Sequence, residues 1–187
     1  RSVGELAALV ASASELGQKV KAVGSGHSFT SAAATNGRMV RLESLSGILN
    51  VDRAKCQVTV GAGTRLSDLN TLLHSEGLAL ANLGDIAYQT VAGAISTSTH
   101  GTGKALTGLA GQVVAMKLIN GQGEIIECSK SVNPQIFDVA RVSVGALGII
   151  TEYTLQAVPS FRLRALEQPM RLDDVLENAH DLASTND

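Results

Sequence analysis

The residues best suited to chemistry in this sequence lie in two segments rich in glycine, serine and threonine. The first, Val23-Gly24-Ser25-Gly26-His27-Ser28, follows an alternating run that predicts a strand. Successive backbone N–H groups in such a turn can converge on a phosphate, and glycine lets the backbone approach an anion that a Cβ would keep away. This segment is therefore either a pyrophosphate-binding loop or an ordinary tight turn.

The first segment does not match the dinucleotide-binding signature GxGxxG. After Gly24 and Gly26, the third glycine position holds Phe29, and residues 30–37 do not form an amphipathic helical pattern. A nicotinamide-dependent Rossmann dehydrogenase is therefore disfavoured, but it is kept as an alternative.

The second segment, Thr97-Ser98-Thr99-His100-Gly101-Thr102-Gly103-Lys104, departs from the P-loop signature at both ends. GxxxxGK[ST] requires glycine at position 98 and serine or threonine at position 105, where this chain has Ser98 and Ala105. The segment therefore either lies flat against a ligand or forms a close-packed helix end.

Other catalytic chemistries find little support in the sequence. No GxSxG motif is present, so the serines do not indicate a serine hydrolase. Cys56 and Cys128 are far apart and are expected to be inert thiols. No metal site is expected, because none of the four histidines lies in an HxH, HExxH or Cys/His cluster: His27, His74, His100 and His180.

Composition places the chain among globular proteins with a real core. Its 187 residues are 44% hydrophobic and predict about one domain. A formal charge of -2 and 3% aromatic residues argue against a nucleic-acid partner, which needs basic charge and often stacking rings. The longest uncharged apolar stretches are far shorter than the ~20 residues that span a bilayer, so no transmembrane segment is expected. The expected location is the cytoplasm.

Periodicity predicts how the two segments are held. Helices are expected over 3–16 and 66–73, from Asn133-Pro134 onward with Asn133 as the N-cap, and over 172–182. Strands are expected over 19–23, 40–42, 48–51, 57–60, 113–119, 124–127, 148–156 and 161–166, with hairpins joining 48–51 to 57–60 and 113–119 to 124–127.

Five segments, taken in order, resemble the FAD-binding domain of vanillyl-alcohol-oxidase-type flavoproteins, and in particular the sugar-lactone and alditol oxidase branch. They are 20–29, 57–63, 77–84, 91–103 and 140–150, and together they cover nearly the whole chain. The resemblance implies an α+β fold of the PCMH type with two α/β subdomains. One has a small sheet and the other a larger, mainly antiparallel sheet, with helices around both and FAD between them.

The resemblance also implies roles for individual residues. His27 stands where relatives bond covalently to the 8α carbon of the flavin ring, and Asp85 replaces the small serine or alanine common at its position. The residues expected to bind the cofactor are Val23, Gly24, Ser25, Gly26, His27, Ser28, Gly84, Asp85, Thr90, Gly93, Thr97, Ser98, His100 and Ile149.

By the same resemblance, the whole protein oxidises a CH–OH group of an aldonolactone or a polyol by hydride transfer to flavin N5. Oxygen or another acceptor takes the electrons, as in gulonolactone, arabinonolactone, alditol and xylitol oxidases. Residues 1–160 form the FAD-binding domain, and 161–187 begin the connection to a substrate-binding cap domain. Because relatives carry their catalytic residues largely in that cap, this stretch alone is expected to be inactive. A non-catalytic module that keeps the fold is the further alternative.

Overall fold

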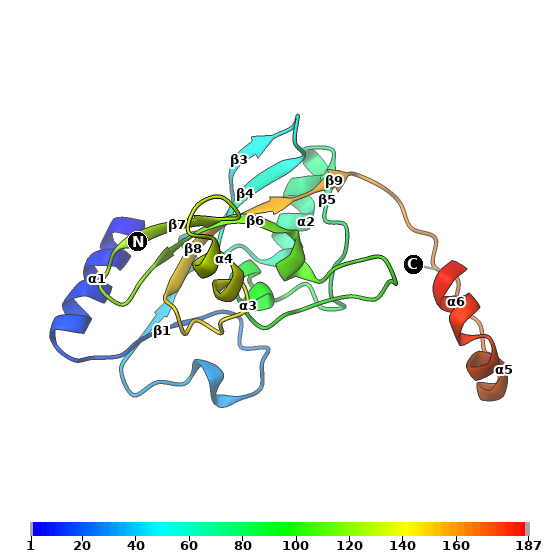
Figure 1. Cartoon of the computed structure of the whole chain (residues 1–187), viewed down its shortest axis with the longest axis horizontal. Helices are drawn as coiled ribbons and strands as arrows, with labels where there is room; N and C mark the ends of the chain where they lie inside the picture. Colours follow the sequence, from blue (N-terminus) through cyan, green and yellow to red (C-terminus); the bar gives the residue numbers. More distant parts are fainter. Residues whose placement is uncertain (1, 186–187) are drawn as a thin grey trace.

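The computed structural model describes residues 2–185, which form a mixed α/β fold (Figure 1). The helices are α1 Val3–Glu15, α2 Leu66–Ser75, α3 Val91–Ser96, α4 Pro134–Ala140, α5 Leu172–Glu177 and α6 Ala179–Thr185, with short 3-10 turns at Ser31–Ala33 and Leu109–Gln112. The strands are β1 Val20–Val23, β2 Arg38–Arg41, β3 Ile48–Asp52, β4 Gln57–Gly61, β5 Leu78–Ala79, β6 Val113–Ile119, β7 Ile125–Ser129, β8 Ile149–Gln156 and β9 Val158–Pro159.

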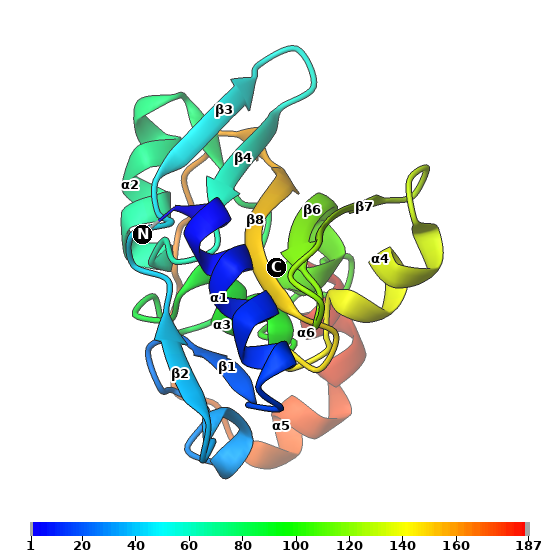
Figure 2. The same ribbon diagram turned by 90° about the vertical axis from the view of Figure 1, so that its left-hand side faces the viewer.

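A five-stranded sheet forms the centre of the molecule. Its strand order is β3-β4-β8-β6-β7, and every neighbouring pair is antiparallel (Figure 2). The middle strand, β8, buries alternate side chains such as Tyr153 and Leu155, as a strand covered on one face should. The β3–β4 and β6–β7 pairs confirm both hairpins expected from the sequence.

Two smaller sheets lie beside the central one. β1 and β2 pair in parallel, and β1 runs directly into the glycine-rich loop that begins at Gly24. β5 and β9 pair antiparallel, which ties the end of α2 to the residues after β8. A small sheet next to a larger antiparallel one confirms the expected α+β class.

Helix α1 joins the small sheet to the large one. It begins at a capping box, in which the Ser2 hydroxyl accepts from Glu5 N at 3.2 Å and the Glu5 carboxylate accepts from Ser2 N at 2.9 Å. It ends before Gly17, whose φ of +62° suits the left-handed C-terminal position. Two residues of its buried face, Leu6 and Val10, lie in one cluster with Leu42, Ala62, Ile119 and Ile149.

The main core lies on the other side, beneath α2 and α3. Leu66, Leu69 and Leu73 form the buried face of α2, which confirms the leucine helix expected from the sequence. They share a cluster with Val91, Ala94 and Ile95 of α3 and with Val58, Val60 and Tyr153 of the sheet. This packing fixes α3, and with it residues 90–97, against the central strands.

The C-terminal part differs from the expectation in two places. Residues 161–170 form neither helix nor strand, so the strand expected over 161–166 is wrong. An alternating pattern makes a strand only where a neighbour pairs with it, and Leu163 and Leu166 are instead 79% and 76% exposed. The single helix expected over 172–182 is two helices, α5 and α6, separated at Asn178. Both stand apart from the body of the molecule (Figure 1).

Asn133 precedes α4 as expected, but its side chain does not cap the helix. Its backbone is left-handed, with φ 49° and ψ 51°, and its amide donates to the Glu127 carbonyl at 2.8 Å. The side chain therefore bonds to β7 instead of to the helix, and the predicted capping role is wrong.

Candidate functional site

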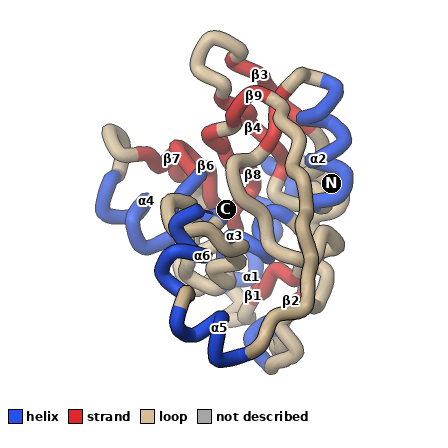
Figure 3. The backbone as a smooth tube through the Cα atoms, turned by 90° about the vertical axis from the view of Figure 1, so that its right-hand side faces the viewer, coloured by secondary structure: helices blue, strands red, loops and turns tan. Residues whose placement is uncertain are grey.

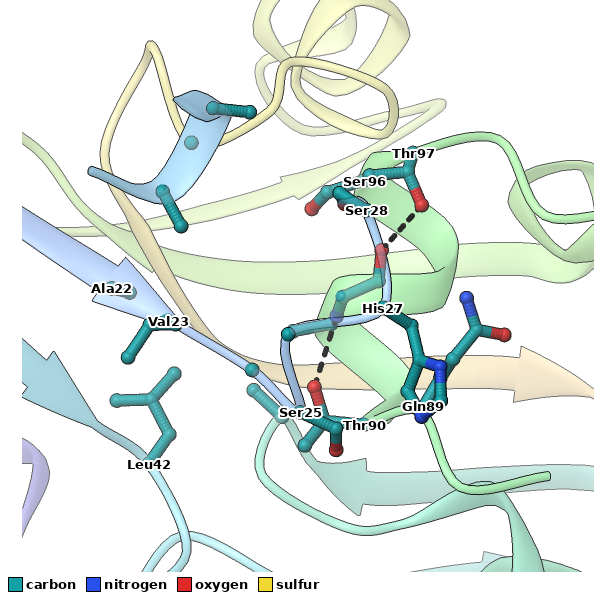
Figure 4. A pocket seen from close by; sticks show the side chains of 18 of the residues that line it. Ala22, Val23, Ser25, His27, Ser28, Leu42, Gln89, Thr90, Ser96 and Thr97 are labelled. Atoms are coloured by element: carbon teal, nitrogen blue, oxygen red, sulfur yellow. Dashed lines mark hydrogen bonds between the residues drawn. The ribbon is translucent and has the colours of Figure 1, made fainter. Parts of the chain in front are cut away.

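A cavity of about 220 Å³ lies between the small sheet, the N-terminal end of α3 and the start of β8. Its walls come from four parts of the chain: residues 21–33, residues 41–43 with 62–65, residues 89–97, and residues 144–150. Figure 4 shows side chains from three of these parts around one space. The central and small sheets therefore meet at this cavity.

The glycine-rich loop after β1 packs closely onto α3. A Cβ on Gly24 would lie 2.6 Å from Thr90 Oγ1, which is too close for a side chain, and 3.7 Å from Gly93 Cα, an ordinary contact distance. Gly26 has a φ of +78°, in the left-handed region that favours glycine. These two glycines let the loop backbone form one wall of the cavity.

The first turn of α3 faces the same space, held by its own hydroxyl groups. Thr90 Oγ1 accepts from Gly93 N at 3.2 Å and caps the helix, and Thr97 Oγ1 donates to the Gly93 carbonyl at 2.8 Å (Figure 4). Within segment 97–104, Thr97 fits both sequence interpretations, because it is the C-cap of the packed helix α3 and also lines the cavity.

His27 lies in the loop with one ring nitrogen unpaired. The residue is half-buried, its Nδ1 is buried without a hydrogen-bond partner, and its ring meets the Phe29 ring edge-on with centroids 5.9 Å apart. Phe29 is itself 89% exposed and has a φ of 52°, unusual for a bulky residue. In Figure 4 the imidazole points to the same corner of the cavity as the Gln89 amide. An orphaned nitrogen here indicates a site that is completed by something else.

Charged side chains form another part of the wall. Arg41 Nε lies 2.6 Å from Glu43 Oε1, and Lys21 and Arg65 line the same space. The pKa of Glu43 is lowered, first because its carboxylate accepts a backbone N–H and then because of Arg41 and Arg65. Three cations against one carboxylate leave this wall with a net positive charge, which suits an anionic ligand.

The predicted cofactor residues fall into two groups. Ten line the cavity: Val23, Gly24, Ser25, Gly26, His27, Ser28, Thr90, Gly93, Thr97 and Ile149. The other four do not line it: Gly84, Asp85, Ser98 and His100.

The second group lies close by. A Cβ on Gly84 would lie 2.7 Å from Thr99 Cγ2, and Thr99 Oγ1 accepts from Gln89 Nε2 at 3.2 Å. Gln89 lines the cavity, so Gly84 lies against a residue, Thr99, that is hydrogen-bonded to the cavity wall. Asp85 and His100 are exposed, and His100 Nδ1 lies 2.9 Å from the Gly101 carbonyl.

Several wall residues were not predicted. They include Lys21, Arg41, Glu43, Arg65, Gln89, Ser96, Val144, Gly145 and Gly148. Gly145 and Gly148 carried a usable signal, since two glycines before a predicted strand indicate an unusual backbone. The charged residues carried none, because single charges on short strands and loops occur throughout this sequence.

A second orphaned polar group lies in the core behind α3. The Tyr153 hydroxyl is buried without a hydrogen bond of good geometry, although the Ser96 hydroxyl is near it. Burial raises the pKa of this phenol strongly, so it stays protonated. Ser96 lines the cavity, and Tyr153 supports that wall from behind.

Three further findings bear on the sequence predictions. Between residues 2 and 185, no three His, Cys, Asp or Glu side chains gather as a metal site would require. Within the same residues, Cys56 and Cys128 are both free thiols. The helices described there are all too short or too polar to cross a membrane.

Comparison with known proteins identifies the class of this fold and site. Residues 1–129 match the family described as FAD binding domain, and the chain belongs to this family. It is 45% identical to L-gulonolactone oxidase of Mus musculus over 177 residues, which cover 95% of this chain and 40% of that protein. It is 40% identical to L-gulono-1,4-lactone dehydrogenase of Mycobacterium tuberculosis over 186 residues, which cover 100% of this chain and 43% of that protein.

A third similar protein is D-arabinono-1,4-lactone oxidase of Eremothecium gossypii, 37% identical over 182 residues, which cover 95% of this chain and 34% of that protein. The chain thus spans well under half the length of these relatives. Its antiparallel central sheet also differs from the parallel sheet of a Rossmann dehydrogenase, so the nicotinamide alternative is not favoured.

The cavity fits the FAD that its family binds. Its glycine loop supplies backbone without side chains, its charged wall is net positive, and His27 Nδ1 is buried without a partner. A phosphate-bearing cofactor requires the first two features. The third feature is a ring nitrogen, Nδ1 of His27, that makes no hydrogen bond within the protein.

Proposed function

We propose that the intact protein is an FAD-dependent oxidoreductase that oxidises a CH–OH group of an aldonolactone or an alditol, with its FAD bonded to His27. The relatives named above, two lactone oxidases and a lactone dehydrogenase, support the substrate class. The observation that carries the proposal is the unpaired Nδ1 of His27 on a glycine loop of this cavity. When bound, FAD supplies the hydride acceptor at N5, while the carbinol loses one hydride and one proton and becomes a carbonyl.

The environment of His27 suits a nucleophilic imidazole. No carboxylate within the described residues is hydrogen-bonded to its ring, and the edge-on contact with Phe29 restricts the ring's orientation. Attachment joins a ring nitrogen to the 8α carbon; the imidazole and that carbon each give up one proton, and two electrons leave with them. Oxygen, which we propose as one acceptor of the enzyme, takes both protons and both electrons.

The other residues of the cavity hold the cofactor in this proposal. Gly24, Ser25, Gly26 and Ser28 surround the diphosphate with backbone N–H groups, and the Ile149 backbone meets the adenosine end. Thr90, Gly93 and Thr97 line the other side. Gly84, Asp85, Ser98 and His100 lie outside the cavity, and we propose that they approach the flavin ring where it extends past Gln89.

Acid precipitation of the intact protein tests the covalent bond. We expect the yellow colour to stay with the pellet, and a tryptic peptide containing His27 to carry the added mass of the flavin. His27→Ala removes that mass, whereas His74→Ala, at an exposed position on α2, leaves it unchanged. Colour found only in the supernatant contradicts the covalent bond and leaves FAD binding intact.

A substrate panel tests the reaction. Aldonolactones and alditols are offered to the intact protein, and turnover is followed with oxygen and with an artificial dye as acceptor. Turnover of a lactone or alditol supports the proposal, and the ratio of the two rates distinguishes an oxidase from a dehydrogenase. A protein that binds no flavin and turns over no substrate would instead be a non-catalytic module with this fold.

The domain division belongs to the same proposal. We propose that residues 1–160 form the FAD-binding domain and that 161–187 lead towards a substrate-binding cap domain, which supplies the remaining catalytic groups. A cytoplasmic location also stays a prediction, which cell fractionation tests directly.

A further inference from the structure

One wall of the cavity, made by residues 144–148, has a strained backbone. Val144 and Gly145 have φ values of 51° and 73°, and Gly148 has a φ of 143°. Valine is branched at Cβ and rarely adopts the left-handed conformation, so its presence there has an energetic cost. Residues in such conformations persist only where their surroundings hold them, and they occur often at ligand-binding clamps.

A single side chain from β1 reaches this strained wall. Lys21 Nζ donates to the Val144 carbonyl at 2.9 Å, and a Cβ on Gly145 would lie 4.0 Å from the same nitrogen. The ammonium group is therefore seated against the two left-handed residues. Other hydrogen bonds of this segment are local, such as those from Ala146 N to the Ser143 carbonyl and from the Ser143 hydroxyl to the Ala140 carbonyl.

By its place in the chain, Lys21 also belongs to the wall that carries the glycine-rich loop. It lies on β1, which continues directly into Gly24 and the loop that carries His27. Its side chain and the backbone of Val144, Gly145 and Gly148 line the same cavity. One side chain thus connects two walls that are far apart in the sequence.

We propose that Lys21 is a positioning residue of the cofactor cavity, whose ammonium group holds the Val144–Gly145 backbone in its left-handed form and so fixes the wall made by residues 144–148. The inference rests on the proposed placement of FAD in this cavity. A lysine suits the task because it is a charged donor, and hydrogen bonds from charged groups are stronger than those between neutral groups.

The proposal predicts different effects for three substitutions. Lys21→Met keeps the length of the side chain and removes its donors. We expect FAD affinity to fall about tenfold, the loss typical of one hydrogen bond from a charged group. Lys21→Arg restores a charged donor and should recover most of the affinity. Val144→Gly removes the strain, so adding it to Lys21→Met should recover affinity as well.

The experiment measures two properties of each variant. Hydrogen exchange of the backbone amides of residues 142–148 is followed in the intact protein, and the dissociation constant of FAD is measured in a His27→Ala background, where any FAD is held non-covalently. Lys19→Met is the matched control, because Lys19 is exposed beside β1 and does not line the cavity. The melting temperature identifies general unfolding.

Faster exchange at 142–148 together with weaker FAD binding in Lys21→Met, both reversed by Lys21→Arg, supports the proposal. Unchanged exchange overturns it, and so does faster exchange with unchanged FAD affinity. Failure of the proposed function has a different signature: the protein with Lys21 intact then binds no FAD in either background.

Discussion

Gly24 lies where the loop backbone comes close to the N-terminal end of α3, with no space for a side chain. A Cβ there would meet the Thr90 hydroxyl at 2.6 Å, and that hydroxyl is occupied in capping α3. We therefore expect Gly24→Ala to move the loop away from α3, lower the flavin content of the intact protein and destabilise it by about 1–3 kcal/mol. Flavin absorbance per polypeptide and urea unfolding measure the two effects.

Gly121 provides the control for this substitution. It lies in the β6–β7 turn, and its φ is not left-handed. No atom lies within 4 Å of the position that a Cβ would take. Gly121→Ala should leave flavin content unchanged and stability within about 0.5 kcal/mol of the original. If Gly24→Ala behaves in the same way, the loop does not depend on close contact with α3.

At the scale of elements, three strands of the central sheet are joined by one charged row. Lys117 on β6 lies in register with Glu127 on β7 and Glu152 on β8, with N–O distances of 3.0 and 3.3 Å. The Glu127 hydrogen bond, followed by the charge of Glu152, raises the pKa of Lys117. This row holds the register on the face of the sheet where apolar packing is incomplete.

We expect Lys117→Met to destabilise the protein by about 0.5–1 kcal/mol at neutral pH, a small value because these groups are partly exposed and screened by salt. Since the pKa of Lys117 is higher in the folded state, its contribution is complete below the ordinary lysine value of 10.5 and is lost as the pH rises above it. Urea unfolding at pH 7 and pH 11 should therefore show a smaller difference between the two proteins at pH 11 than at pH 7. An equal difference at both pH values would mean that packing of the side chain, and not its charge, is responsible.

Element types and boundaries could be predicted where a local pattern decides them. The apolar spacing of Leu66, Leu69 and Leu73 and the glycine at 77 define α2 without reference to any other part of the chain. The strand expected over 161–166 does not form because an alternating pattern is not sufficient for a strand. A neighbouring strand must also pair with it, and none of the described residues does so. The expected Asn133 cap failed because a tertiary contact, the bond to the Glu127 carbonyl, outcompeted the local one.

At the scale of the whole molecule, the chain runs as a loop from β9 to α5 (Figure 3). Several large apolar side chains of residues 161–185 are exposed. No helix or strand protects residues 161–170. We expect trypsin to cut this 187-residue chain first at Arg162 or Arg164, before it cuts at Arg53, which is paired with Glu76 beside α2. Mass spectrometry of a digestion time course identifies the order, and a first cut at Arg53 would show that the C-terminal segment packs on the body.

Only part of the cavity could be predicted from the sequence. The glycine loop and residues 90–97 are continuous motifs, so their residue types reveal them. Lys21 and Val144 meet only after the whole chain has folded, and neither residue type marks the contact. Gln89 was missed for the same reason, since its role depends on Thr99 and on the nearby turn of α3.

The position of the cavity between the two sheets has a consequence for the order of events in the cell. His27 is synthesised early, but residues 144–150 of the same cavity follow much later in the chain, so the complete cavity cannot exist on a half-made chain. A cofactor that reacts only inside the finished cavity would be attached after both sheets have docked. The bond that we propose at His27 would then form only in molecules whose two sheets have already docked.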